Sequence, residues 1–432
     1  MKSQRSRTSS LPRAPTTPPA NRVSRRESVI CACRQSARSA HCAGMRWVAL
    51  AMLASVAIVR AVSADEPALQ ALAVVNVGAD QGVFVEAEDG RVLASVVADR
   101  AVHPASVTKV ATTLALLERL GPDHRFETRV GATGALRAGR LAGDLVVHGG
   151  NDPFFVYESA FLLLRRLHVL GVRRIQGGTR VDGTFLLNWE PDPTGSRLVR
   201  VLAGREGAPA WPAVAQGEAL GATAIVFEGP APVSPQPERA LVVYRSPPLL
   251  HVLKVCNGYS NNVLHFASDA IGGPHVVEAI ARAAVPPALR AEITIDNGAG
   301  AGKTNRISPR AAVAILRALD RHVGSIGHDV TDLLPVSGVD PGTLEGRFLD
   351  HRRYVVGKTG TFGSEGASAL VGLLRSPRYG RVAFAVLNHG VPVPAARAKQ
   401  DAFVRALIDA VGAEPWPYES PTRPTYTLDQ VE

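Results

Sequence analysis

Residues 103–121 read HPASVTKVATTLALLERLG, a stretch that predicts a helix with polar residues at its start. Pro104 suits the first turn of a helix, apolar residues then recur at helical spacing, and Gly121 ends the pattern. Ser106 and Lys109 stand three positions apart at its start. A helix therefore places the hydroxyl and the amine on one face, within hydrogen-bond reach.

The Ser106–Lys109 pair has the composition of an activated nucleophile. Serine is a weak nucleophile at neutral pH and needs an adjacent base. Lysine supplies one when burial or nearby positive charge lowers its pKa, and a helix N-terminus favours the negative charge that develops there. Taken alone, the pair more often marks a surface helix with a solvated lysine.

A second polar segment, Ser260-Asn261-Asn262, lies between two predicted helices over 246–256 and 263–271. A hydroxyl beside a carboxamide can relay a proton and hold a substrate amide. An ordinary helix cap and turn is the alternative, because Ser and Asn favour such positions.

A third segment, Lys358-Thr359-Gly360-Thr361, ends a predicted strand. Its cation and hydroxyl can bind a substrate carboxylate, and Gly360 leaves room for substrate against the strand edge. A strand that simply ends in a turn is the alternative.

Strand patterns flank the helix on both sides. Two β-rich runs in 82–97 surround an Asp-Gly pair, which predicts a hairpin. Three strands within 352–361, 366–376 and 381–390 have short connections and predict an antiparallel meander. Helices are also predicted over 308–320, with Ser308 as N-cap, and over 394–411.

Residues 128–244 differ in character, with short β runs around one helical stretch and then a Pro/Gly-rich segment. We predict a reduced inserted domain there, and a boundary near 244. The catalytic domain is then 65–127 and 245–413, behind a leader at 1–64. The Pro-rich tail, 414–432, is expected to be exposed.

The net charge of +10 suggests a polyanion partner until its location is considered. Residues 1–64 hold eleven Lys/Arg and a single acid, Glu27, whereas the remaining chain carries 37 charges of each sign. The excess basic charge therefore belongs to the leader, and we expect no nucleic acid partner.

The leader has the parts of a secretory signal peptide: Arg46, the apolar run 47–59, and small residues before a cleavage site after Ala64. The run is short for a membrane span, although an uncleaved anchor is the alternative. Residues 1–44 are either a basic tail or the result of a start placed ahead of Met45. We expect an exported, periplasmic or extracytoplasmic protein, and Cys256 is then its one cysteine, which excludes an internal disulfide.

In this order, the three polar segments match the S-x-x-K, S-x-N and K-T-G motifs of serine β-lactamases and penicillin-binding proteins. The chain resembles one branch, the D-alanyl-D-alanine carboxypeptidase/endopeptidase family of class C low-molecular-weight penicillin-binding proteins (peptidase family S13). Further segments that carry the resemblance are LAGDLVVHGGNDPFF (141–155), IDNGAGAGKTNRISP (295–309) and LLPVSGVDPGTLEGRF (333–348). The resemblance covers most of residues 80–390, with the matching segments in the same order.

The resemblance implies an α/β (α+β) fold of the serine β-lactamase/DD-peptidase type: an antiparallel sheet flanked by helices, a helical lobe and a small β-rich insertion. The implied activity is penicillin-sensitive serine-type D-Ala-D-Ala carboxypeptidase, with DD-endopeptidase activity left open, on peptidoglycan stem peptides. β-Lactams would be covalent inhibitors. No metal or cofactor is implied, and peripheral membrane contact is left open.

The implied roles begin with Ser106 as nucleophile and Lys109 as general base. Ser260 would relay a proton to the leaving amine, and Asn262 would hold the peptide amide. Lys358 and Thr359 would bind the terminal carboxylate. The backbone N–H groups of Ser106 and Thr361 would form the oxyanion hole, with Gly360 beside them.

Two positions depart from the family pattern. Asn261 replaces its usual Asp, and Ala299 replaces the Ser of its D-G-S-G segment. A β-lactamase or esterase of the same fold, and a non-catalytic cell-wall-binding protein, are the competing interpretations.

Overall fold

The computed structural model describes residues 66–210, 224–229, 237–420 and 430–432. The predicted leader and its cleavage site lie outside these ranges. Within them, no helix has both the length and the apolarity to cross a membrane.

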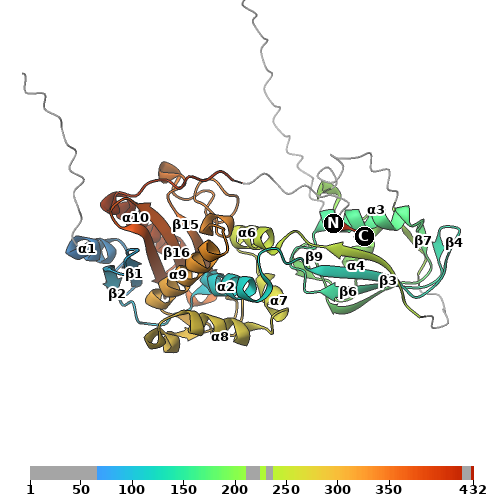
Figure 1. Ribbon diagram of the computed structural model, residues 1–432, viewed down its shortest axis with the longest axis horizontal. Coiled ribbons are helices and arrows are strands. Elements are labelled where there is room, and N and C mark those ends of the chain that lie inside the picture. The colour runs from blue at the N-terminus through green and yellow to red at the C-terminus, as the bar shows by residue number, and fades with distance from the viewer. Residues whose placement is uncertain (1–65, 211–223, 230–236, 421–429) are drawn as a thin grey trace, which may run out of the picture. The chain divides into compact units, whose positions relative to one another are not determined.

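The larger of the sheets has five antiparallel strands in the order β15-β16-β17-β1-β2 (Figure 1). The predicted hairpin and meander are both present, and they join because β1 pairs with β17. This pairing joins two elements some 300 residues apart in the sequence into one sheet. The strands are β1 (Gly82–Glu86), β2 (Val92–Val96), β15 (Val356–Phe362), β16 (Ala367–Ser376) and β17 (Gly380–Asn388).

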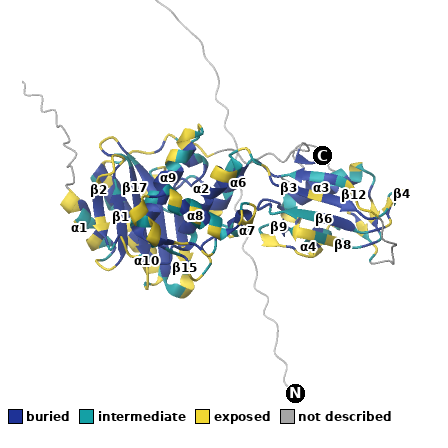
Figure 2. Ribbon diagram, turned by 60° about the horizontal axis from the view of Figure 1, so that its bottom comes forward, coloured by how far each residue is buried: buried dark blue, intermediate teal, exposed yellow. Residues whose placement is uncertain are grey.

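Helices cover both faces of this sheet, so its strands are buried on both sides (Figure 2). Successive side chains of a strand point to opposite faces. On β17, Phe384 and Val386 therefore pack with α1 and α10, whereas Ala385 and Leu387 pack with α2 and α9. The helices of this part are α1 (Glu66–Asn76), α2 (Lys109–Leu120), α6 (Leu249–Tyr259), α7 (Leu264–Asp269), α8 (Pro274–Ala284), α9 (Pro309–Ser325) and α10 (Val393–Val411).

Helix boundaries differ from the sequence expectation at α6. The helix does not break at Asn257-Gly258 but continues to Tyr259, and Ser260 ends it in the left-handed conformation (φ 57°). The predicted cap of α9 is present, because the Ser308 hydroxyl accepts a hydrogen bond from the Ala311 N–H. The helices α1 and α8 were not predicted.

The chain between α2 and α6 has its own core. A mixed sheet has the order β12-β3-β6-β8, in which β6 and β8 run parallel. The helix α3 packs on it through Leu163 and Leu167, both fully buried. The elements are β3 (Glu127–Ala132), β6 (Leu145–Gly150), β8 (Thr179–Thr184), β12 (Arg239–Arg245), α3 (Tyr157–Val169) and α4 (Ser196–Leu202). Shorter strands are β4 (Leu136–Arg137), β5 (Arg140–Leu141), β7 (Arg174–Ile175), β9 (Leu186–Leu187), β10 (Glu190–Pro191) and β11 (Val226–Phe227).

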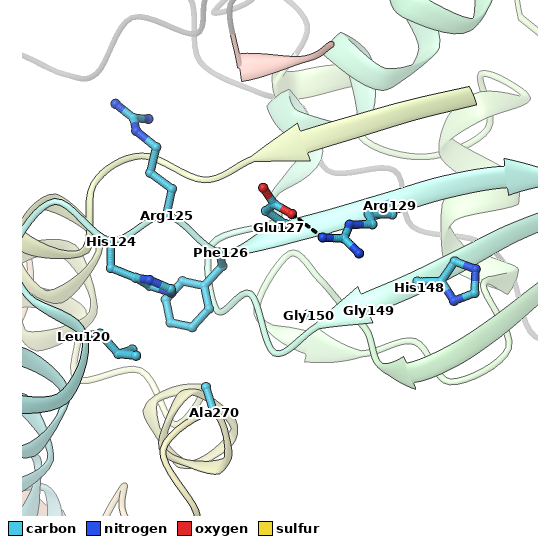
Figure 3. A pocket seen from close by; sticks show the side chains of 10 residues that line it. All are labelled: Leu120, His124, Arg125, Phe126, Glu127, Arg129, His148, Gly149, Gly150 and Ala270. Carbon is cyan, nitrogen blue, oxygen red and sulfur yellow. Dashed lines mark hydrogen bonds and ion pairs between the residues drawn. The ribbon is translucent and has the colours of Figure 1, made fainter. Parts of the chain in front are cut away.

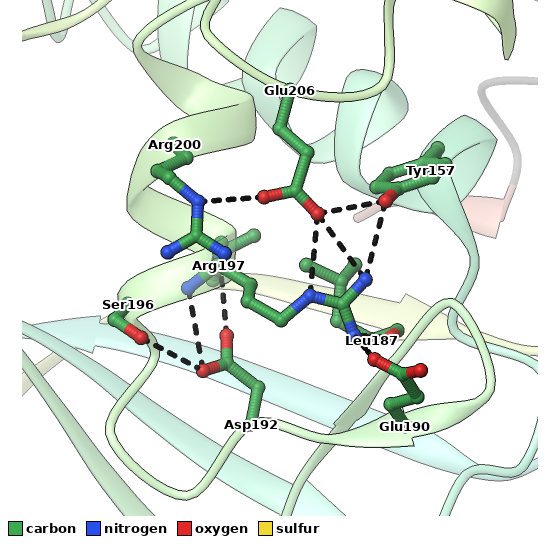
Figure 4. A network of polar contacts seen from close by, with 9 residues as sticks. Tyr157, Leu187, Glu190, Asp192, Ser196, Arg197, Arg200 and Glu206 are labelled. Carbon is green, nitrogen blue, oxygen red and sulfur yellow. Dashed lines mark hydrogen bonds and ion pairs between the residues drawn. The ribbon is translucent and has the colours of Figure 1, made fainter.

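A polar network fastens α4, which the sequence did not predict, to the start of α3 (Figure 4). Glu206 accepts hydrogen bonds from the Tyr157 hydroxyl (2.7 Å) and from the guanidinium groups of Arg197 (3.2 Å) and Arg200 (2.7 Å). Arg197 also donates to the Leu187 carbonyl (2.8 Å). The half-buried carboxylate of Glu206 is therefore fully hydrogen-bonded, and the network holds α4 and α3 together.

The expectation of an exposed C-terminal tail holds for most of its described residues, and is wrong for Trp416, Gln430 and Val431, which are buried. Trp416 is 3% exposed, and the Tyr418 hydroxyl donates to Asp340 (2.8 Å). Val431 is buried in the core of the β12 sheet, where it forms an antiparallel bridge with Tyr244. The tail therefore contributes apolar side chains to both cores, because burying such side chains is favourable.

Candidate active site

Ser106 and Lys109 lie where a 3₁₀ turn, Ala105–Thr108, leads into α2. Lys109 Nζ is 2.7 Å from Ser106 Oγ, so the structure brings the predicted nucleophile and base into direct contact. Ala105 adopts a left-handed backbone conformation (φ 48°), which costs a non-glycine residue on the order of 1 kcal/mol. Such strain persists where the surrounding structure holds a residue in place.

Lys109 is buried completely, and burial lowers its pKa from 10.5 to about 7. The cause is desolvation, because an ammonium loses more on leaving water than an amine does. Besides Ser106, its Nζ contacts Ala299 O (2.7 Å) and Asn262 Oδ1 (3.2 Å). Both of these oxygens only accept hydrogen bonds.

These contacts fix the direction of the Lys109 lone pair. A neutral amine has two N–H groups and one lone pair, and the oxygens of Ala299 and Asn262 take the two N–H groups. The lone pair of the neutral amine is then left for Ser106 Oγ, which lies 2.7 Å away, and can accept the proton of its hydroxyl. This is the hydrogen-bonding pattern that a general base needs.

Ser260 and Lys358 form a second pair. Lys358 Nζ donates to Ser260 Oγ (2.9 Å) and to Thr359 O (2.9 Å). Lys358 is fully buried, and burial together with the positive charge of Lys109 lowers its pKa well below 10.5. A substrate carboxylate at this position would supply the missing counter-charge and raise that pKa again.

Thr359 contacts a residue that the sequence did not single out. Its hydroxyl donates to Thr343 Oγ1 (2.8 Å), and the Thr343 hydroxyl lies 3.3 Å from Gly258 O. Thr343 belongs to the 333–348 segment, which was recognised only as part of the family resemblance. Thr359 is buried, with 9% of its surface exposed.

Gly360 has a different reason for being glycine from the one predicted. A Cβ there would lie 2.7 Å from Pro104 O and 3.0 Å from Ser106 N. The absent side chain therefore admits the turn that carries Ser106, rather than the substrate. Because β15 and this turn lie so close, the N–H of Ser106 is near the strand that carries Thr361. An oxyanion hole formed by these two N–H groups requires this arrangement.

The family departure at Asn261 affects a side chain that hydrogen-bonds the backbone before α7 and not Ser106 or Lys109. Asn261 Oδ1 accepts a hydrogen bond from the Val263 N–H (3.2 Å) at the entry to α7. Thr361 is the exposed end of its motif, and Arg397 Nη2 donates to its hydroxyl (2.9 Å). Neither Thr343, Arg397 nor the Ala299 carbonyl was identified from sequence, since a backbone oxygen and tertiary contacts carry no local signal.

A hollow lies apart from these residues, at the start of β3 (Figure 3). Phe126, His124 and His148 line it, and Glu127 accepts a hydrogen bond from Arg129 (2.8 Å) beside it. None of its lining residues belongs to the three motifs. Within the described residues, no group of three or more His, Cys, Asp or Glu side chains is placed to hold a metal ion.

The sequence model of the D-Ala-D-Ala carboxypeptidase 3 (S13) family matches residues 61–192 and 221–409. The chain belongs to this family. The predicted family and the predicted class of enzyme, a D-Ala-D-Ala carboxypeptidase, are therefore confirmed. The roles of individual S13 residues in this chain stay predictions.

Individual relatives agree with this S13 assignment. Carboxypeptidase DacB of Mycolicibacterium smegmatis is 27% identical over 387 residues, which is 78% of this chain and 82% of that protein. A D-alanyl-D-alanine carboxypeptidase of Actinomadura sp. (strain R39) is 33% identical over 122 residues, covering 28% of this chain and 21% of that protein.

Solved structures confirm the predicted fold class. The Bd0816 predatory endopeptidase of Bdellovibrio bacteriovorus matches with a TM-score of 0.67 at 22% identity, over 82% of this chain and 99% of that one. Penicillin-binding protein 4 of Haemophilus influenzae matches with a TM-score of 0.58 at 16% identity, over 79% and 99%. At these identities the likeness establishes the fold.

Proposed function

We propose that this S13 enzyme cleaves the terminal D-Ala-D-Ala bond of peptidoglycan stem peptides through an acyl-enzyme on Ser106. The observation that carries the proposal is the 2.7 Å contact between Ser106 Oγ and a buried Lys109 whose pKa is lowered to about 7. At neutral pH a large fraction of Lys109 is an unprotonated amine and can accept the serine proton.

In the first step, Ser106 Oγ attacks the carbonyl carbon between the two D-alanines while Lys109 takes its proton. The N–H groups of Ser106 and Thr361 stabilise the tetrahedral oxyanion, an interaction worth about 10²–10³ in rate per donor in other enzymes. Ser260, hydrogen-bonded to Lys358, relays the proton that Lys109 accepted to the leaving amine, and D-alanine departs with Lys109 neutral again. Water then hydrolyses the ester and regenerates Ser106.

The terminal carboxylate of the substrate selects the position of cleavage. Lys358 supplies positive charge and Thr359 a hydroxyl, and both lie on β15, the edge strand of the five-stranded sheet. Asn262 also orients Lys109 in the free enzyme (3.2 Å), so its proposed contact with the peptide amide is an additional role.

β-Lactams are proposed to acylate Ser106, since they place a reactive carbonyl and a carboxylate at the same spacing as the dipeptide. Two relatives of the same fold support this: penicillin-G-acylated Bd3459 of Bdellovibrio bacteriovorus and the β-lactam complex of Haemophilus influenzae penicillin-binding protein 4. We further propose export to the periplasm or cell surface, where stem peptides are found, on the strength of the basic and apolar leader.

The proposal is tested by digesting purified muropeptides that contain pentapeptide stems and cross-bridges, with identification of the products. Release of free D-alanine by wild type, and none by Ser106→Ala, is expected. Loss of cross-linked dimers would add DD-endopeptidase activity. Absence of both products would contradict the proposal.

The competing functions have their own readouts. Rapid multiple turnover of a chromogenic cephalosporin, with no action on muropeptides, would identify a β-lactamase. A non-catalytic cell-wall-binding protein would take up no fluorescent penicillin, and mass spectrometry would find Ser106 unmodified.

A further inference from the structure

The loop of residues 296–305 supplies the Ala299 carbonyl to Lys109, yet it is neither helix nor strand. It connects two short strands, β13 (Ile293–Thr294) and β14 (Arg306–Ile307). A carbonyl in a helix or sheet is aimed by the regular backbone. The Ala299 carbonyl has no such support, so other contacts must hold it on the amine.

Asn305 provides the contacts that hold the loop. It is fully buried, and its Oδ1 accepts hydrogen bonds from the N–H groups of Asp296 (3.1 Å) and Asn297 (3.1 Å). Its Nδ2 donates to Asn297 O (2.9 Å) and to Thr108 Oγ1 (3.1 Å). One side chain thus ties both ends of the loop together and fastens them to the residue next to Lys109.

The side chain of Asn297 continues this support to the carbonyl itself. Asn297 Oδ1 accepts hydrogen bonds from the N–H groups of Ala299 (3.0 Å) and Ala301 (3.1 Å), on either side of Gly300. Thr112 on α2 donates to Gly298 O (2.6 Å). The peptide units around the Ala299 carbonyl are therefore held from within the loop and from the nucleophile helix.

The backbone of the loop at residue 300 lies so close to the turn at Ala105 that only glycine fits there. Gly300 has a φ of 76°, and a Cβ there would lie 1.9 Å from Ala105 O. The same Ala105 O accepts a hydrogen bond from the Thr108 hydroxyl (2.9 Å), which in turn accepts from Asn305. Loop, turn and helix start are thus joined through Thr108.

We propose that Asn305 is a positioning residue for catalysis: by holding the 296–305 loop against Thr108, it keeps the Ala299 carbonyl on Lys109 and so aims the amine lone pair at Ser106. The inference rests on the proposed function, in which Lys109 is the base. Asn305 itself touches neither substrate nor the reacting atoms.

The inference predicts a particular kinetic defect. Without the Ala299 carbonyl, Lys109 loses a hydrogen-bond acceptor that fixes the orientation of its amine. Formation of the acyl-enzyme then slows, whereas the carboxylate site around Lys358 and Thr359 is untouched. Noncovalent binding of a β-lactam should therefore be retained.

The test measures acylation by a fluorescent penicillin over a range of concentrations and pH, which separates the binding constant from the acylation rate constant. In Asn305→Ala we expect the rate constant to fall at least tenfold, with binding within threefold of wild type. The midpoint of the pH–rate curve should also move, because the ammonium form of Lys109 loses the same acceptor.

A matched control and a second variant accompany it. Asn388→Ala removes another fully buried asparagine, which hydrogen-bonds Gln81 and Gln400 and no residue of the site. It should lower thermal stability comparably while leaving the rate constant and the midpoint unchanged. If Asn305→Ala does not fold, Thr108→Val removes the same link with an isosteric side chain and should show the same kinetic defect.

Two outcomes overturn the inference. One is a folded Asn305→Ala or Thr108→Val with wild-type acylation. The other is a fall in the acylation rate constant that also occurs in Asn388→Ala and that follows the loss of thermal stability in both variants. Failure of the proposed function itself is distinguishable, because wild type would then take up no label at Ser106.

Discussion

Lys109 shows how a single residue is changed by where the fold puts it. In water its amine would be protonated at any physiological pH. Complete burial beside α6 and the 296–305 loop lowers the pKa to about 7. The sequence predicts the spacing to Ser106, but the shift depends on desolvation by residues distant in the chain, which spacing does not reveal.

The first prediction concerns the pH dependence of acylation. Because the reaction needs the neutral amine of Lys109, the acylation rate should rise about tenfold per pH unit below 7 and level off above it. Stopped-flow or quench measurements with a β-lactam between pH 5 and 9 check this. A rate that is independent of pH across that range would exclude Lys109 as the base.

The second prediction concerns Lys109→Met. Acylation should fall by a factor of about 10²–10⁴, the usual contribution of a general base. The pKa of Lys109 is lower when folded than when unfolded, so wild type gains stability as pH rises from about 7 to 10.5. The variant lacks this gain.

The stability difference between Lys109→Met and wild type should therefore favour the variant most below pH 7 and shrink toward pH 10. Thermal unfolding at pH 6 and at pH 10 measures it. A difference that is constant with pH would mean that Lys109 is not desolvated in the folded protein.

At the scale of elements, the strand β15 and the turn before α2 form the site by close backbone contact. The sequence predicts both elements, and it places Gly360 at the strand end. It does not reveal that Gly360 faces Pro104 and Ser106. That contact exists only because the sheet brings a strand alongside a turn some 250 residues earlier in the sequence.

The third prediction follows from this contact. Gly360→Ala puts a methyl group 2.7 Å from Pro104 O and 3.0 Å from Ser106 N, so the turn must shift. The acylation rate should drop at least tenfold, because displacing the Ser106 N–H disturbs the oxyanion hole.

Gly363→Ala is the matched control for Gly360→Ala. Gly363 follows β15, and a Cβ there meets no atom within 4 Å. This variant should retain wild-type acylation and thermal stability. If the two variants lose activity equally, the contact between β15 and the turn is not what Gly360 provides.

At the scale of the whole molecule, the active site draws on the larger sheet and its helices, whereas the β12 sheet has a core of its own. Leu114 of α2 packs in the first of these cores and Leu163 of α3 in the second, and both are fully buried. Both cores therefore contribute to the stability of the protein, but only the first core packs beneath the active site.

The fourth prediction compares these leucines. Leu114→Ala and Leu163→Ala should each lower the free energy of unfolding by about 2–5 kcal/mol, the usual cost of such a cavity. Acylation by penicillin should stay within about twofold of wild type in Leu163→Ala and fall several-fold in Leu114→Ala, whose helix carries Lys109. Equal loss of acylation in both variants would contradict the separation.

The sequence by itself determined the local elements and the chemical groups. Helical periodicity, an Asp-Gly turn and a Ser308 cap are short-range signals, so the nucleophile helix, the hairpin, the meander and α9 were predictable. The three polar motifs, in order, indicated a serine β-lactamase or penicillin-binding protein, because their residue types are the ones that acyl transfer requires. The segments 141–155, 295–309 and 333–348 then indicated the S13 branch.

Tertiary structure alone decided how these groups work together. The pairing of β1 with β17, the burial of the C-terminal Trp416 and Val431, and the contacts of Thr343 and Asn305 join segments far apart in the chain. Lys109 becomes a base only when other elements exclude water from it, and its lone pair is aimed by a backbone carbonyl. Desolvation and backbone geometry are properties of the packed chain, and no residue type encodes them.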